Sequence, residues 1–334
     1  MSVARARYLL IVVAVLAVVG VGAPHAGPYL LLLTTKSLII AMLAMSTDLL
    51  LGYTGLPSLG QAAFMGVGAY FAAIVANRYG LGLGCDFALV LAGGALVGAI
   101  LAALFGLLAV RATGVYFLMI TLALGMVVWG VVYKWTSLTG GDNGMNLTTS
   151  PTCGVGLQDP TNYFYLSLAI FVLVLGSLYV LVNSPFGRSL LGIRESEVRM
   201  RILGYNTWLH KYLAFIISGA CGGIAGVLWA HLNHIVSPEV AILGTSVDAL
   251  LMVILGGPGT LVGPAIGAAI IVFLREYLST LITWWLYVLG AVYILTIYYL
   301  PEGLMGIPEY IRNARHAKGA VEPVAAVSID KSAT

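Results

Sequence analysis

The chain contains 334 residues, of which 60% are hydrophobic and only 9% charged, and its net charge is +3. A soluble domain carries about 25% charged residues, so this composition excludes an ordinary soluble protein and indicates one surrounded mainly by lipid. The small net charge gives no indication of a nucleic-acid partner. The apolar runs are long and lack strict alternation. We therefore predict an all-α integral membrane protein, a polytopic helical bundle rather than a membrane barrel.

The first apolar run follows Arg5 and Arg7 and has two interpretations. It is either a cleaved signal peptide ending near residue 27 or a retained first span, and we favour retention because further spans follow at once. The predicted membrane segments cover residues 8–23, 29–51, 61–77, 87–110, 114–133, 161–182, 211–231, 245–275 with an interruption, and 281–300.

The positions of the basic residues predict how the chain crosses the membrane. They gather before the first span, in the loop 183–211 and in the polar tail 301–334, whereas the loop 135–160 has two acids and no basic residue. Since positive loops stay in the cytoplasm, both termini and the 183–211 loop are predicted to be cytoplasmic, and the 135–160 loop outside. With both termini on the same side, the number of membrane crossings must be even. This requires the 245–275 region to enter and return, or to form two short helices. We expect nine or ten membrane segments in one domain, residues 1–300, followed by a partly disordered tail.

Two glycine-rich stretches interrupt the apolar pattern: "LGYTGLPSLG" at Leu51–Gly60 and "LGGPGTLVGP" at Leu255–Pro264. Both contain Leu-Gly-x-x-Gly and both follow an apolar segment with one acid, which suggests a weak internal repeat. Paired interruptions in the two halves of a transporter indicate the substrate route, because irregular backbone at membrane depth must be buried or line a wet cavity. The predicted pathway residues are Asp48, Gly52, Gly55, Gly60, Asp248, Gly256, Gly257, Gly259 and Gly263.

Less specific interpretations of these residues stay open. The glycines could serve only close helix packing, as small residues do in membrane bundles. Asp48 and Asp248 could cap free N–H groups near helix N-termini, and "GTSV" before Asp248 is a plausible helix start.

Residues 184–206 mix charged and apolar side chains in a way that predicts one or two amphipathic helices, ended by Gly204. Such a helix could lie on anionic lipid or form a knob for a cytoplasmic partner. The acids Glu195 and Glu197 among the arginines weaken the lipid interpretation.

The predicted outer side carries two further features. Gly140, Gly141 and Gly144 form a turn-rich loop that is either a tight connector or an outer gate or docking surface. Cys85 and Cys153 fall in loops on that side and could form a disulfide. The cysteine and histidine spacings predict no metal site, and no cofactor is indicated.

Five stretches, in order along the chain, resemble one family: "STDLLLGYTGLPSLGQAAFMGVGAY", "GVYFLMITLALG", "WTSLTGGDNGM", "SPFGRSLLGIRESEVRMRILGYN" and "LLMVILGGPGTLVGPAIGA". They are similar to the inner-membrane permeases of branched-chain amino acid ABC importers of the leucine–isoleucine–valine type, from about residue 40 to 300. The resemblance implies a second, similar permease, two cytoplasmic ATPases and a periplasmic binding protein.

By the same resemblance, residues 184–206 dock on an ATPase. The predicted coupling residues are Arg188, Arg194, Glu195, Glu197, Arg199 and Gly204. Arg199 and Met200 depart from the family pattern, in which two small residues usually follow the acid-rich start. Docking through these two positions is therefore in doubt.

The sequence argues against an enzyme. It has no Gly-Lys pair and so no P-loop, which places any ATP hydrolysis on a partner, and no nucleophile–base arrangement is present. We predict a permease subunit that moves branched-chain amino acids by alternating access. Urea or short amides are the alternative substrates, and an ion-coupled secondary transporter is a further alternative.

Overall fold

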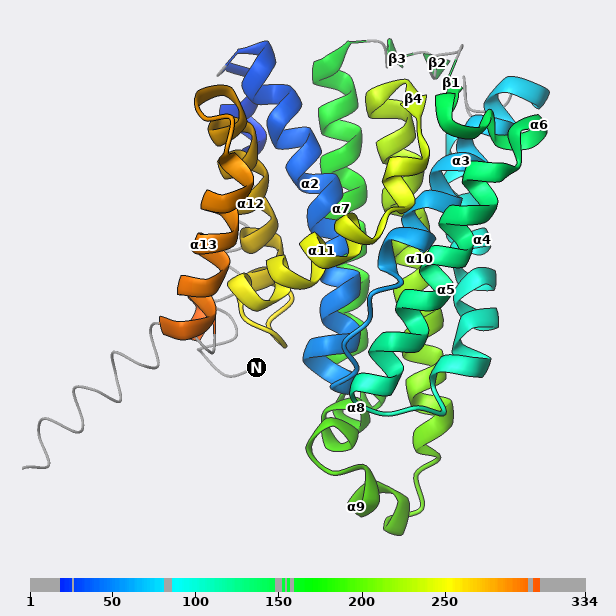
Figure 1. Ribbon diagram of the computed structural model, residues 1–334, viewed down its shortest axis with the longest axis vertical. Helices are drawn as coiled ribbons and strands as arrows, with labels where there is room; N and C mark the ends of the chain where they lie inside the picture. Colours follow the sequence, from blue (N-terminus) through cyan, green and yellow to red (C-terminus); the bar gives the residue numbers. More distant parts are fainter. Residues whose placement is uncertain are drawn as a thin grey trace, which may run out of the picture.

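A computed structural model describes residues 19–25, 27–80, 86–147, 152–153, 155–156, 159–299 and 303–306. Cys85, the side chain of Cys153, most of the predicted first span and most of the tail lie outside the described residues. The long helices run side by side between two ends (Figure 1). We call the end with α8 (Pro185–Glu195) and α9 (Glu197–Ile202) the α8 end, and the end with β1 (Met145–Asn146) and β4 (Ile235–Val236) the β1 end.

Long apolar helices dominate the described part of the chain. Six are long and apolar enough to cross a membrane, and two shorter apolar helices accompany them. The protein is therefore an all-α polytopic membrane protein, as predicted. Besides α8 and α9, the described α-helices are α2 (Pro28–Asp48), α3 (Gln61–Tyr79), α4 (Phe87–Ala109), α5 (Val115–Lys134), α6 (Thr136–Thr139), α7 (Pro160–Asn183), α10 (Thr207–Asn233), α11 (Leu243–Gly256), α12 (Val262–Leu281) and α13 (Trp285–Tyr299).

Short elements connect these helices. A π-helix, η1 (Leu49–Thr54), extends α2, and 3-10 turns lie at η2 (Gly141–Asn143), η3 (Pro238–Ala241) and η4 (Leu304–Gly306). The strand β1 pairs antiparallel with β4, and β2 (Thr152–Cys153) pairs with β3 (Val155–Gly156).

The interrupted region 245–275 forms two helices, α11 and α12, joined by a turn at residues 257–261. This confirms the two-helix alternative that the charge distribution required. The first glycine-rich stretch has a different form, because α2 continues through η1 and residues 55–60 then run without helix to α3. The 183–211 segment contains two helices, as expected, and Gly204 follows α9 with a left-handed φ of 87°.

The core lies around α2 and α10. In their most apolar windows, 78% of the α2–η1 residues and 67% of the α10 residues are buried, against 22% for α5. Small residues permit this packing, since a Cβ added to Gly223 of α10 would collide with the carbonyl of Gly94 on α4.

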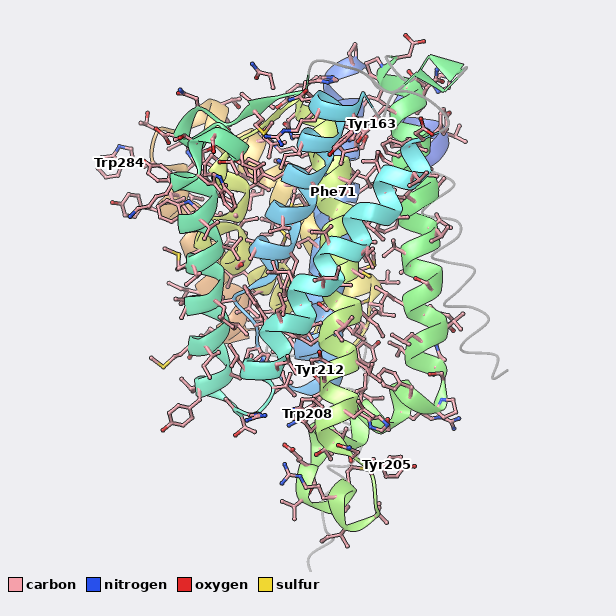
Figure 2. All side chains as sticks on the ribbon, turned by 90° about the vertical axis from the view of Figure 1, so that its right-hand side faces the viewer. Phe71, Tyr163, Tyr205, Trp208, Tyr212 and Trp284 are labelled. Carbon is pink, nitrogen blue, oxygen red and sulfur yellow. The ribbon has the colours of Figure 1, made fainter. Side chains whose placement is uncertain are left out.

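Aromatic side chains lie near both ends of the bundle (Figure 2). Trp208 and Tyr212 stack at 5.0 Å between ring centroids towards the α8 end. Tyr163 and the 70% exposed Trp284 lie towards the β1 end. This distribution is typical of a protein whose two ends meet the membrane–water interfaces.

Candidate functional site

The two glycine-rich stretches, about 200 residues apart in sequence, meet in the structure. A Cβ added to Gly52 in η1 would lie 2.8 Å from the Cα of Gly259 in the α11–α12 turn, and closer still to the Gly259 nitrogen. Gly259 itself has a φ of 86°, a backbone conformation that residues with a Cβ rarely adopt. Glycine is therefore required on both sides of this contact, which we call the glycine junction, Gly52 with residues 257–261.

Asp48, the last residue of α2, holds the turn of the glycine junction in place. Its Oδ1 accepts a hydrogen bond from the Gly259 N–H at 2.7 Å, and its Oδ2 accepts one from the Leu261 N–H at 3.1 Å. Asp48 is fully buried, and Leu261 is the residue directly before α12. The carboxylate thus fixes the backbone just before α12 from the end of another helix, whereas the capping interpretation expected Asp48 itself near a helix N-terminus.

Arg194 of α8 reaches the junction from the α8 end. Its Nη1 donates a hydrogen bond to the Gly52 carbonyl, a group that the end of η1 leaves available. The same nitrogen lies 3.2 Å from the Cβ position of Gly259, and Arg194 Cγ lies 3.2 Å from that of Gly55. One predicted coupling residue therefore contacts both predicted pathway interruptions.

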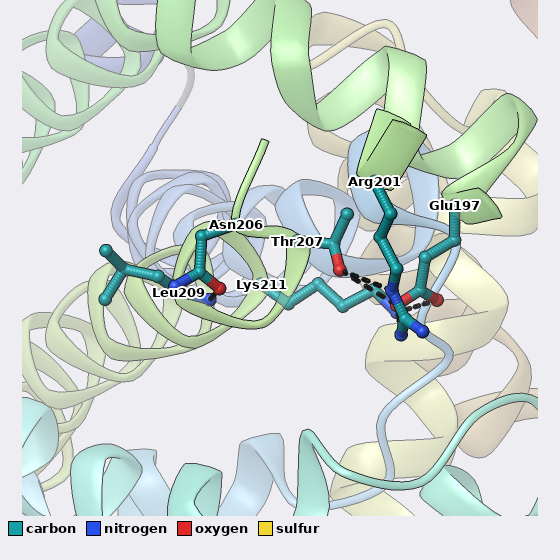
Figure 3. Close-up of polar contacts among 6 residues, drawn as sticks. All are labelled: Glu197, Arg201, Asn206, Thr207, Leu209 and Lys211. Carbon is teal, nitrogen blue, oxygen red and sulfur yellow. Dashed lines mark hydrogen bonds and ion pairs between the residues drawn. The ribbon is translucent and has the colours of Figure 1, made fainter. Parts of the chain in front are cut away.

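Glu197 ties α9 to the first turns of α10 (Figure 3). It forms ion pairs with Arg201 at 2.5 Å and with Lys211, whose side chain is 4% exposed, and it accepts a hydrogen bond from Thr207 at 3.1 Å. Burial opposes ionisation of Glu197. The hydrogen bonds from Lys211 and Arg201 outweigh it and lower the pKa of the carboxyl below its ordinary value. Serine side chains cap both short helices, Ser184 for α8 and Ser196 for α9.

The other predicted coupling residues are free on the surface of α8 and α9. Arg188, Glu195 and Arg199 are exposed, and no ion pair joins them to another residue in the described ranges. The same projecting surface shows apolar side chains, with Val198 68%, Ile202 81% and Leu203 65% exposed. The α8–α9 unit, residues 184–206, therefore combines a fixed interior with an apolar and basic outer surface.

Asp248 lies away from the glycine junction. It is in the second turn of α11 and pairs with Arg275 of α12 at 3.0 Å, so it does not cap its own helix. With Arg275 it lines a cavity of about 720 Å³ bounded by α2, α10, α11, α12 and α13. Of the nine predicted pathway residues, Asp248 lines this cavity and the other eight do not.

Comparison with known proteins identifies the family. The family described as "Branched-chain amino acid transport system / permease component" matches residues 29–297. The chain belongs to this permease family. It is 31% identical to the high-affinity branched-chain amino acid transport system permease protein LivM of Salmonella typhimurium, over 86% of this chain and 73% of that protein. It is also 31% identical to the Escherichia coli LivM, over 82% of this chain and 69% of that protein.

A second type of permease in the same family also matches. LivH of Salmonella typhimurium, named as a permease of the high-affinity branched-chain amino acid transport system, is 28% identical over 42% of this chain and 46% of that protein. No solved structure matches the chain.

Gly140, Gly141 and Gly144, the glycines of the predicted outer loop, lie in a turn that leads to a short strand pair. Gly140, Gly141 and Gly144 all have positive φ, between 63° and 75°. They lead into β1, which pairs Met145 with Val236 and Asn146 with Ile235. The loop therefore contacts residues 235–237, of which Ile235 and Ser237 line the cavity.

The remaining predicted glycines serve close packing and turns. Gly60 precedes α3, and a Cβ there would lie 3.2 Å from the Thr121 carbonyl of α5. Gly256 and Gly263 place α11 and α12 in backbone contact, and Gly257 has a φ of 112° in the turn between them. The packing interpretation thus holds for the geometry of these positions, and their role in a pathway stays a prediction.

Sequence reasoning missed several charged residues that matter here. Lys36 and Arg275 lie inside predicted apolar segments, Glu276 directly follows one, and all three line the cavity, yet only acids beside glycines were singled out from the sequence. An ionisable residue inside a membrane segment is itself a functional signal, and it would have found Lys36 and Arg275. Lys211 was counted only as a loop charge, although it lies in the second turn of α10 and pairs with Glu197.

Proposed function

We propose that this permease is the pathway subunit of an ABC importer for branched-chain amino acids and works by alternating access. It would pair with a second, related permease, bind two cytoplasmic ATPases and receive its substrate from a periplasmic binding protein. In this proposal residues 1–300 form one domain in the bacterial inner membrane, with both termini in the cytoplasm. Positive charge at the α8 end supports that orientation.

The contact between Arg194 and the glycine junction is the observation that carries this proposal. The α8–α9 unit is internally fixed by Glu197 and externally apolar, as a docking surface for a protein partner requires. A displacement of α8 would act on the end of α2 and the start of α12 together, through Arg194, Gly52 and Asp48. Because the chain has no P-loop, the energy for that displacement must come from the partner ATPases.

Co-purification from membranes that also contain the candidate ATPases tests the docking step. Val198→Asp together with Ile202→Asp places two charges in the proposed interface and should abolish co-purification. Tyr79→Asp is the matched control, because Tyr79 is 72% exposed on α3, far along the chain from the α8–α9 unit. Equal recovery of ATPases with the double variant and the wild type would contradict docking through α9.

Uptake by the reconstituted importer tests the transport step. Vesicles with the complete complex should take up leucine only when ATP is supplied. Uptake driven by an ion gradient without ATP would instead favour a secondary transporter, and ATP-driven uptake of urea but not leucine would favour the amide alternative.

A further inference from the structure

The cavity beside Asp248 has a wall with five charged side chains, and four of them form two ion pairs. Lys36 of α2 pairs with Glu276 of α12, and Arg275 of α12 pairs with Asp248 of α11. Residues 275 and 276 are adjacent, so α12 presents one cation and one anion to two different neighbouring helices. All four residues line the cavity.

These ion pairs are accessible from the cavity. Their side chains are between 27% and 51% exposed, in contrast to the complete burial of Asp48 at the glycine junction. Each cation also lies over an indole, Lys36 at 5.9 Å from the Trp229 ring and Arg275 at 5.2 Å from the Trp285 ring. The aromatic faces help to hold the cations if their carboxylate partners turn towards a ligand.

Most of the remaining wall is apolar. The charged side is continued by Glu239 and Asn233, and the other residues include many with aliphatic side chains. They include Ile40, Leu43, Val240, Ile271, Val272 and Leu289. A volume of about 720 Å³ lies within the range of small-molecule pockets and leaves room for a ligand with its water.

From this arrangement we propose that the cavity binds an α-amino acid zwitterion with an aliphatic side chain, as a site within this single subunit. The ligand's carboxylate would replace the protein carboxylates as the partner of Lys36 and Arg275. Its ammonium would meet Asp248 and Glu276, and its side chain would lie on the aliphatic wall. The inference rests on the proposed transport function and adds to it the residues that select the substrate class.

The paired charges distinguish the candidate substrates. A zwitterion replaces each broken protein ion pair with a new one, so the four charges of the two pairs keep partners. Urea or a neutral amide provides neither charge, and a carboxylic acid or an amine alone leaves one protein charge without its partner. The cavity therefore favours amino acids over the neutral amides that sequence reasoning had left open.

The test is ATP-driven uptake of radiolabelled L-leucine by the complete importer in proteoliposomes. Lys36→Met with Glu276→Gln removes one pair at similar volume, and Asp248→Asn removes one carboxylate charge. Each should reduce the uptake rate by about tenfold or more. Asp86→Asn is the control, since this substitution makes the same chemical change at an exposed position before α4, outside the cavity lining.

Competition sharpens the test. An excess of unlabelled isoleucine or valine should inhibit leucine uptake, whereas leucinamide, 4-methylpentanoic acid, 4-methylpentanamide and urea should not. ATP-dependent wild-type uptake with unchanged rates in both cavity variants would overturn the site and leave the transport function intact. Absence of any ATP-dependent leucine uptake by the wild type would overturn the transport function itself. The elution profile in detergent, compared with the wild type, confirms that each variant is folded.

Discussion

Asp48 and Asp248 occupy equivalent places in the sequence pattern and have opposite surroundings in the structure. Both lie in an apolar helix shortly before a Leu-Gly-x-x-Gly stretch. Asp48 is fully buried and accepts backbone N–H hydrogen bonds with both oxygens, whereas the Asp248 side chain is 27% exposed and pairs with a single arginine in the wall of a cavity. The comparison separates an acid that fixes backbone from one that is available for exchange with a ligand.

The same difference holds for the surroundings of the two acids. Backbone atoms fill the space at the glycine junction, where Gly52 meets Gly259. Around Asp248, side chains leave a cavity of about 720 Å³. We infer that the junction transmits movement between helices while the cavity holds substrate. The following predictions attempt to break that division of roles.

Replacement of the two acids by alanine should give the largest contrast in stability. Asp48→Ala leaves two buried N–H groups without partners, which costs about 1–3 kcal/mol each and lowers the apparent melting temperature by about 5–15 °C. Asp248→Ala removes a partly exposed ion pair and should cost less than about 1 kcal/mol. Thermal unfolding of the purified permease in detergent measures both. Similar losses in the two variants would contradict the comparison.

Replacement of one glycine at the junction and one at the cavity by alanine should give the next largest difference in stability. Gly52→Ala places a Cβ against the Gly259 backbone, and such overpacking costs about 1–3 kcal/mol. Gly244→Ala, at the cavity, meets its nearest atom at 3.8 Å and should be tolerated. Expression level and melting temperature report both variants, and a stable Gly52→Ala protein would show that the junction has room to adjust.

Arg194→Met tests whether the junction transmits work. We expect normal ATP hydrolysis by the complex but about fivefold or more fewer leucine molecules transported per ATP, because one charge-assisted hydrogen bond to Gly52 is lost. Arg78→Met is the matched control, since Arg78 is exposed at the end of α3, outside both the junction and the α8–α9 unit. Transport and hydrolysis that fall in proportion would instead indicate a docking defect.

Much of the architecture could be predicted because a membrane imposes long apolar helices and a charge asymmetry between their ends. The interruption of 245–275 followed from the charge distribution and the glycine-rich stretch together, which left a returning segment and two short helices as alternatives. The contact between the two glycine stretches could not be predicted, since nothing local in "LGYTG" indicates a partner more than 200 residues away. The roles of Asp48 and Asp248 also depend on which neighbouring helix each one faces, and that is a property of the packing.

Glu197 provides the smallest and most specific effect, because its ion pairs lie at the water-facing α8 end. Its pKa is lower in the folded protein than in the unfolded chain, so the folded state binds fewer protons. The stabilisation is therefore complete above the ordinary carboxyl pKa and is lost as the pH falls through the lowered value.

Melting curves between pH 7 and pH 4 measure this contribution of Glu197. At pH 7 the wild type should melt about 1–3 °C above the Glu197→Gln variant, and the difference should shrink towards pH 4. Glu195→Gln is the control, because Glu195 is exposed on the adjoining helix and forms no ion pair among the described residues. A constant difference across this range would mean that Glu197 acts through packing. The α8–α9 unit would then be held to α10 by shape rather than by charge.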